Sequence, residues 1–73
     1  DEYEANYLSA AREAGNAMTF SLFDGRVVQG RVAGFGPYSI TLRQEGETEI
    51  TLNKLAIVSY RRVITENRGE GRS

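Results

Sequence analysis

The stretch from Phe23 to Leu42 constrains the fold of this chain more than any other part of its sequence. Asp24-Gly25 lies between two apolar runs, and a two-residue hairpin turn needs positive φ angles, which Gly adopts freely and Asp tolerates. Gly30 and Gly34 then interrupt a strand pattern, and a glycine inside a strand marks a bulge, a bend or a close backbone approach. The sequence therefore predicts a hairpin whose long second strand bends over itself, as in a small β-barrel.

The flanking segments predict one helix and the other strands. Residues 2–14 are rich in Ala, begin with acidic side chains and precede Gly15, which favours a helix with a glycine C-cap. Its apolar side is expected on Tyr3, Tyr7, Ala10 or Ala11, and Ala14. Alternation of apolar and polar residues predicts strands over residues 17–23, 38–43 and 47–52, with a turn at Glu45-Gly46. Their inward faces, with that of the bent strand, are expected to carry Met18, Phe20, Leu22, Val28, Val32, Tyr38, Ile40, Leu42, Thr48, Ile50 and Leu52.

A fifth strand is expected over residues 56–62, where Ala56-Ile57-Val58 are apolar at consecutive positions. Such a run is typical of a strand buried on both faces, one facing the barrel and one facing a neighbouring subunit. Ordinary core packing with Val58 exposed is the simpler alternative. Residues 1–63 are interpreted as one domain, and the polar, Gly-rich residues 64–73 as a flexible tail.

Size and composition narrow the class of protein. A chain of 73 residues buries only about 60% of the surface that its unfolded form exposes, and without Cys or His it lacks disulfides and imidazole metal sites. Oligomerisation is the remaining common way to stabilise it. No apolar run is long enough to span a membrane, and we expect a cytoplasmic protein. Because the net charge is −1, the protein is not expected to be a general binder of polyanions, and any site for RNA must be confined to a small part of its surface.

The same composition predicts that the protein is not an enzyme and needs no cofactor. Without His or Cys, the usual pairs of nucleophile and base are missing. The spacing of Gly30, Gly34 and Gly36 fits neither a P-loop nor a dinucleotide-binding fingerprint. Glu47 and Glu49 share a flat strand face with too few converging oxygens for a cation, so no metal site is expected.

Several short motifs occur in an order that resembles the Sm-like (LSm) family, and within it the bacterial Hfq group of RNA chaperones. These motifs are Asp24-Gly25, Gln29-Gly30, Gly34-Phe35, Tyr38 and Lys54-Leu55-Ala56-Ile57. The resemblance implies a mainly β, Sm-like (SH3-like) barrel of five bent antiparallel strands with an N-terminal α-helix. It also implies a homohexameric ring closed by pairing of exposed edge strands, and binding of U-rich or A-rich single-stranded RNA.

By this resemblance, Tyr38 and Lys54 match the aromatic and the lysine of a proximal, pore-side RNA site. An aromatic face can stack an unpaired base while an ammonium group holds the adjacent phosphate. Two neighbours depart from the family, since Leu55 replaces a histidine and Glu4 stands where a glutamine would help to read the base. The alternative interpretation places Tyr38 in the core or an interface and Lys54 in a solvated turn.

The resemblance also implies a distal site and a rim. The distal site for purines would comprise Gly25, Arg26, Val28, Gln29 and Ser21. Gln29 can bond an adenine edge through its amide, or it is simply an exposed strand residue, and Ser21 replaces a stacking aromatic. On the rim, Arg12 remains from an arginine-rich patch but is followed by an acidic residue.

The sequence therefore predicts a ring protein that binds single-stranded RNA in post-transcriptional regulation. The alternative is an Sm-like ring that acts mainly as a scaffold for protein partners, with weak or no RNA binding. Three features favour that alternative: the absence of the family's histidine, the loss of most arginines from the rim, and the net negative charge.

Overall fold

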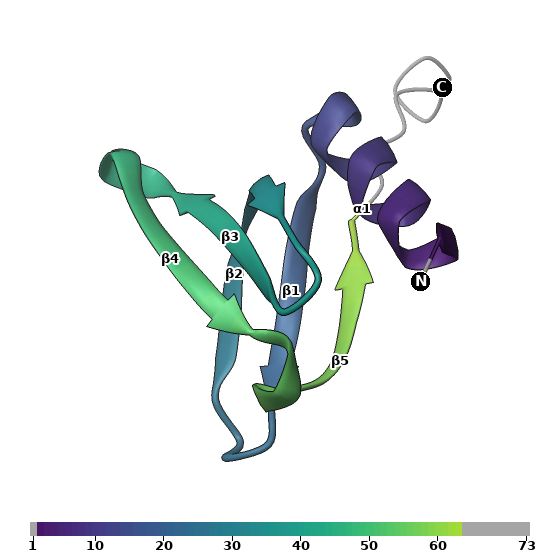
Figure 1. Cartoon of the computed structure of the whole chain (residues 1–73). Coiled ribbons are helices and arrows are strands. Elements are labelled where there is room, and N and C mark those ends of the chain that lie inside the picture. The colour runs from purple at the N-terminus through teal and green to yellow at the C-terminus, as the bar shows by residue number, and fades with distance from the viewer. Residues whose placement is uncertain (1, 64–73) are drawn as a thin grey trace, which may run out of the picture.

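The computed structural model describes residues 2–63, which form an N-terminal helix followed by a five-stranded antiparallel sheet (Figure 1). In chain order the elements are α1 (Glu2–Ala14), β1 (Ala17–Leu22), β2 (Val27–Phe35), β3 (Ser39–Gln44), the 3-10 turn η1 (Glu45–Glu47), β4 (Thr48–Asn53), the 3-10 turn η2 (Lys54–Ala56) and β5 (Ile57–Arg62). The predicted mainly β class with a leading helix is confirmed. The predicted tail, residues 64–73, lies outside the described residues.

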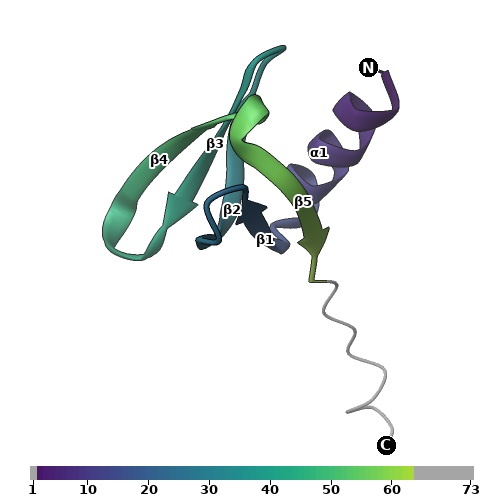
Figure 2. The same ribbon diagram turned by 90° about the horizontal axis from the view of Figure 1, so that it is seen from below.

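The sheet has the strand order β4-β3-β2-β1-β5, so β4 and β5 are its two edges. In a flat sheet these edges would lie about 19 Å apart, because neighbouring strands are spaced by about 4.8 Å. Yet η2 alone joins β4 to β5, and the chain from Asn53 to Ile57 spans at most about 15 Å. The sheet must therefore curl, as Figure 2 shows. Curvature is confirmed; closure into a barrel is not, since within residues 2–63 β4 pairs with β3 and β5 with β1.

The curl of the sheet depends on β2, which pairs with one strand along its first half and with another along its second half. Its first half pairs with β1, and its second half pairs with β3, with a register shift between Val32 and Gly34. At Gly30 an added Cβ would lie 3.0 Å from the Cβ of Leu42 and 3.1 Å from the carbonyl oxygen of Arg43. Gly30 thus permits close approach of β3, and Gly34 accompanies the bulge, as the sequence predicts.

The hairpin at Asp24-Gly25 is confirmed, but its turn differs from the predicted one. Gly25 has a φ of 92°, whereas Asp24 keeps a negative φ. The side chain of Asp24 accepts a hydrogen bond from the backbone N–H of Arg26 at 3.0 Å, and this bond lowers the pKa of the carboxyl group. The Leu22 N–H closes the loop onto the Arg26 carbonyl at 2.9 Å. Asp24 therefore acts through its side chain rather than through a left-handed backbone.

The helix α1 ends as predicted at Gly15, whose φ is 70°. The Gly15 N–H donates to the Arg12 carbonyl and the Asn16 N–H to the Ala11 carbonyl, which is the Schellman pattern. The predicted apolar side is confirmed in part, since Ala11 is buried and Tyr7 packs against the core. Tyr3, however, is 75% exposed, and the buried Leu8 was missed. No helix within residues 2–63 is long and apolar enough to cross a membrane.

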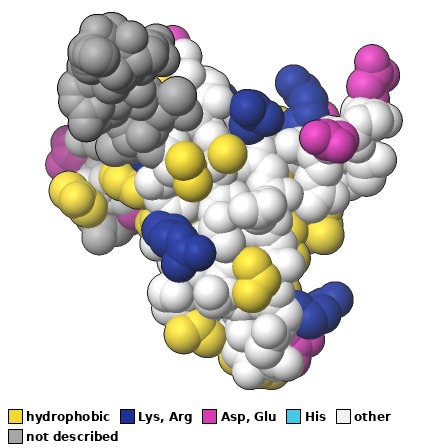
Figure 3. All heavy atoms as spheres, turned by 180° about the vertical axis from the view of Figure 1, so that it is seen from behind, with side chains coloured by type: hydrophobic (Ala, Val, Ile, Leu, Met, Phe, Trp, Pro, Cys, Tyr) yellow, Lys and Arg dark blue, Asp and Glu magenta, His cyan; other side chains and the backbone are white. Residues whose placement is uncertain are grey.

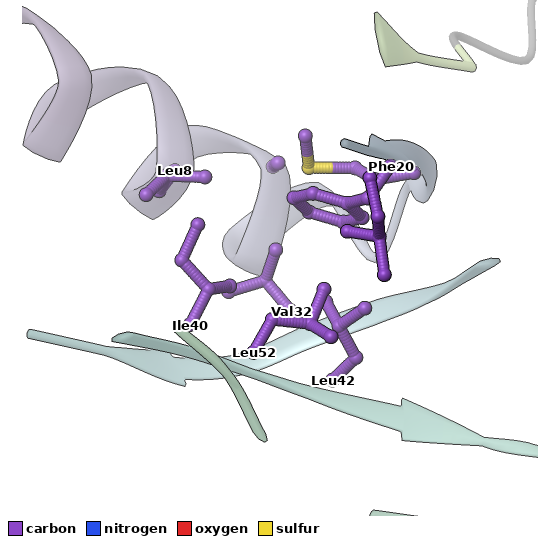
Figure 4. Packing of buried hydrophobic residues seen from close by; sticks show 9 residues of the cluster. Leu8, Phe20, Val32, Ile40, Leu42 and Leu52 are labelled. Carbon is purple, nitrogen blue, oxygen red and sulfur yellow. The ribbon is translucent and has the colours of Figure 1, made fainter. Parts of the chain in front are cut away.

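The core lies between α1 and the concave face of the sheet. Leu8 points from the helix toward Ile40 and the other sheet residues (Figure 4). The buried cluster comprises Leu8, Ala11, Met18, Phe20, Leu22, Val32, Ile40, Leu42 and Leu52. Strand alternation thus predicted most of the core; Tyr38 and Thr48 are exposed, because each lies where its strand begins or just before it.

We expect Gly30→Ala to lower the free energy of unfolding by about 1–3 kcal/mol, because its Cβ would press on the β3 backbone. Gly34→Ala is the matched control, since nothing lies within 4 Å of a Cβ built there. Urea unfolding of both variants measures the difference. Equal stability of the two variants would contradict the close approach at Gly30.

Candidate functional site

The turn η2 connects the two edges of the sheet and is held at both ends. The Asn53 side chain accepts a hydrogen bond from the Leu55 N–H at 2.8 Å and caps the turn. The Lys54 N–H donates to the Tyr38 carbonyl at 2.9 Å, and the Phe23 N–H donates to the Ala56 carbonyl at 3.0 Å. The turn therefore lies against both the β2–β3 loop and the β1–β2 hairpin, with Leu55 90% exposed.

Lys54 forms an ion pair with Glu4 of α1, with 2.8 Å between Nζ and Oε1. The two side chains are only 20% and 29% exposed, whereas Arg26–Asp24 and Arg43–Glu49 pair at the surface. Surface pairs contribute about 0–1 kcal/mol, while removing one partner of a more buried pair leaves an uncompensated charge. The alternative of Lys54 in a solvated turn is therefore wrong.

Tyr60 of β5 lies on the other side of Glu4. Burial of its phenol raises its pKa, and the nearby Glu4 carboxylate raises it further. Its ring packs against Phe20 and Tyr7 at centroid distances of 5.4 Å and 5.8 Å. Glu4 thus interacts with both an ammonium group and a phenol from the sheet side of the molecule.

The Glu4–Lys54 pair lines two cavities. One, of about 310 Å³, is bounded also by Ile40 and by the β5 residues from Ile57 to Tyr60. The other, of about 250 Å³, extends to Phe35 and Pro37 at the β2–β3 loop. Both contain the same two charged groups, so the ion pair forms a wall that they share.

Tyr38 follows Pro37 directly and is 80% exposed, so within a single chain it is not a core residue. Its carbonyl is bonded to the Lys54 N–H. The structure thus gathers the four residues predicted for the proximal site: Glu4, Tyr38, Lys54 and Leu55. The Lys54–Glu4 ion pair therefore lies at a residue whose backbone is bonded to that of exposed Tyr38.

The residues predicted for the distal site are divided between the two faces of the sheet. Val28 pairs with Phe20 and packs against the core, so it belongs to the concave face. Gln29 lies on the opposite face, where its amide donates to the Thr19 hydroxyl at 3.2 Å. The side chains of Val28 and Gln29 point to opposite faces, because neighbouring residues in a strand alternate, yet both residues line one cavity, and the distal site stays a prediction.

The other distal residues lie on β1 and its hairpin. Ser21 is opposite Val27 and half-buried. Gly25 forms the hairpin turn, and the Nε of Arg26 pairs with Asp24 at 2.9 Å. Arg26 is exposed but already has a local anionic partner, which weakens its attraction for a phosphate.

A third cavity, of about 540 Å³, opens where β2 and β3 diverge. Gln29 lines it together with Arg31, Arg43 and Gln44, and the Gln44 amide donates to the Gln29 carbonyl at 2.8 Å. The sequence analysis did not associate these β3 residues with Gln29. A signal existed in the strand alternation, but only the pairing of β2 with β3 brings these residues to one cavity.

At the rim, Arg12 lies with its guanidinium 5.6 Å from the centroid of an aromatic ring of β2. Two strand arginines reach the same end of the helix: Arg31 Nε donates to the Gly15 carbonyl at 2.9 Å, and Arg62 Nε to the Asn16 side chain at 2.6 Å. The arginines come together at this end of the helix only through tertiary contacts. Figure 3 shows that Lys and Arg side chains also spread over the back of the molecule.

Metal binding finds no support in this part of the chain. Across residues 2–63, no group of three or more Asp, Glu, His or Cys side chains is placed to hold an ion. Glu49, one of the two glutamates of the flat strand face, instead pairs with Arg43 at 3.1 Å.

No protein-family model matches this chain, and no curated protein is significantly similar to it in sequence. The relation to the Sm-like family therefore stays a prediction that rests on the residue motifs.

We expect the folded protein to lose stability as the pH rises above about 10, the ordinary pKa of tyrosine. The raised pKa of Tyr60 means that the unfolded chain releases this phenolic proton first. The stabilisation is complete below that pH and disappears as the pH passes the folded-state value. Urea unfolding between pH 8 and 11 measures the effect; Tyr60→Phe should flatten the decline, and the exposed control Tyr38→Phe should leave it unchanged.

Proposed function

We propose that this protein is an Sm-like, Hfq-like ring that binds single-stranded RNA and acts as an RNA chaperone in post-transcriptional regulation. The observation that carries the proposal is the backbone hydrogen bond between exposed Tyr38 and Lys54, whose side chain lines two cavities. An aromatic ring stacks any unpaired base, and a cation attracts the adjacent phosphate. The proposed role is binding, without catalysis or a cofactor.

Ring assembly is supported by the two free edges of the sheet. β4 and β5 each pair on one side within the described chain, and Val58 on β5 is 67% exposed. Unpaired strand edges are templates for pairing with another chain, and head-to-tail pairing that closes gives a ring. We propose a cytoplasmic homohexamer, in which the Tyr38–Lys54 site is repeated around the axis.

The exposed sheet face supplies the proposed secondary contacts. Gln29 and Arg43 line the 540 Å³ cavity, and Arg26 lies at the nearby hairpin. An amide offers both a donor and an acceptor to a purine edge, and arginine binds phosphates. A-rich strands are the proposed ligands of this face, and U-rich strands those of the Tyr38–Lys54 site.

The second candidate function is a ring that serves mainly as a scaffold for protein partners. Lys54 is already neutralised by Glu4, which reduces its attraction for phosphate. Leu55, Phe23 and Val58 are exposed to 90%, 74% and 67%, and such side chains suit an apolar partner. RNA titration separates this candidate from the first.

We expect Tyr38→Ala to weaken binding of a fluorescein-labelled hexauridine about tenfold, because one stacked base contributes about 1–3 kcal/mol. Phe23→Ala removes an aromatic ring of similar exposure from the β1–β2 hairpin, and it should bind like the unchanged protein. Fluorescence anisotropy at two salt concentrations makes the measurement. Absence of micromolar binding to U-rich and A-rich strands would favour the scaffold.

We expect Val58→Asp to dissociate the ring into folded monomers. Placed on every β5 edge, the new carboxylate would be buried between subunits, while in a monomer it stays in water. Light scattering measures the mass, and circular dichroism verifies the fold. An unchanged mass, or a monomeric parent protein, would exclude assembly through β5.

A further inference from the structure

The Glu4–Lys54 pair has a donor and acceptor pattern of its own. An ammonium group only donates hydrogen bonds, and an ionised carboxylate only accepts them. Oε1 of Glu4 is bonded to Lys54 Nζ at 2.8 Å, but a carboxylate has two oxygens and about four lone-pair positions. Both side chains line the two cavities, so a ligand there meets an ammonium donor next to the acceptor oxygens of a carboxylate.

The four RNA bases differ in how they match this pattern. The Watson–Crick edge of guanine carries an acceptor, O6, followed by two donors, N1–H and N2–H₂. Uracil flanks its single donor with two acceptors, while adenine and cytosine place acceptors where a carboxylate would meet them. Lysine bonds guanine O6 in nucleic-acid complexes, and carboxylates accept from base amino groups. Guanine alone satisfies all three positions.

The residues around the ion pair support a site of the size of one base, in which the Glu4 carboxylate is already held in place. Glu4 is held from the sheet side by Lys54 and by the partly buried Tyr60, so its carboxylate does not have to be ordered on binding. The cavity on that side measures about 310 Å³, within the range of small-ligand sites. Tyr38, adjoining Lys54 through its carbonyl, offers an exposed ring for stacking.

We infer that Glu4 makes the Tyr38–Lys54 site selective for a guanine base in single-stranded RNA, with Glu4 accepting from N1–H and N2–H₂ and Lys54 donating to O6. This inference rests on the proposed RNA-binding function and specifies its ligand. Within the U-rich strands proposed for this site, a guanine is preferred to a uracil at the position that Glu4 contacts, because the second uracil carbonyl would face the carboxylate with no donor between them.

The test compares labelled hexauridines that carry a central guanosine, inosine or uridine, by anisotropy with the full chain. Inosine lacks only the N2 amino group. We expect guanosine to bind at least about fivefold more tightly than uridine, with inosine between them. Glu4→Gln should abolish the guanosine preference, because an amide offers one donor and one acceptor. Glu2→Gln is the matched control, with the same charge change on an exposed residue of the same helix.

The outcomes are separable. Equal affinity for the three strands, tighter binding of uridine, or a guanosine preference that survives Glu4→Gln overturns the inference and leaves RNA binding in place. A complete absence of binding overturns the RNA-binding function and the inference together. Should Glu4→Gln fail to fold by circular dichroism, the comparison of guanosine with inosine on the unchanged protein still decides the question.

Discussion

The three-residue connection η2 between opposite edges of the sheet is the constraint on which the rest of this structure depends. A flat arrangement is excluded, because the connection is shorter than the width of five strands. The sheet meets this constraint by bending β2 at Gly30, where the missing side chain allows β3 to approach. The resulting concave face receives Leu8 of α1 and becomes the core.

The same connection places the candidate site. Because η2 lies against the β2–β3 loop and the start of α1, Lys54 meets Glu4, which is 50 positions away in the chain. Because the two side chains are partly buried, the ion pair stabilises the contact between α1 and η2. The same pair determines which hydrogen-bond donors and acceptors this surface offers. A lysine alone would attract any phosphate, whereas a lysine beside a carboxylate presents directional donors and acceptors with little net charge. Selectivity, rather than general affinity for polyanions, is what such a pair supports.

Local patterns predicted the fold well, and the site only in part. Glycine positions and period-two alternation located the helix, the strands and the bend, since these depend on neighbours in the chain. On the apolar side of α1, Tyr3 was wrongly included and Leu8 was missed, because only docking against the sheet selects between them. Val28 and Gln29 were grouped by motif order, although alternation already separates their faces.

By itself, the sequence determined which segments are helix and strand, where the chain turns, and that Tyr38 and Lys54 are candidates for binding. Only the tertiary structure decided that Lys54 pairs with Glu4, that Arg31 and Arg62 reach the end of α1, and that β4 and β5 are the edges of the sheet. The reason is that backbone preferences act over a few residues. Side-chain pairing across the molecule depends on how the bent sheet brings distant segments together.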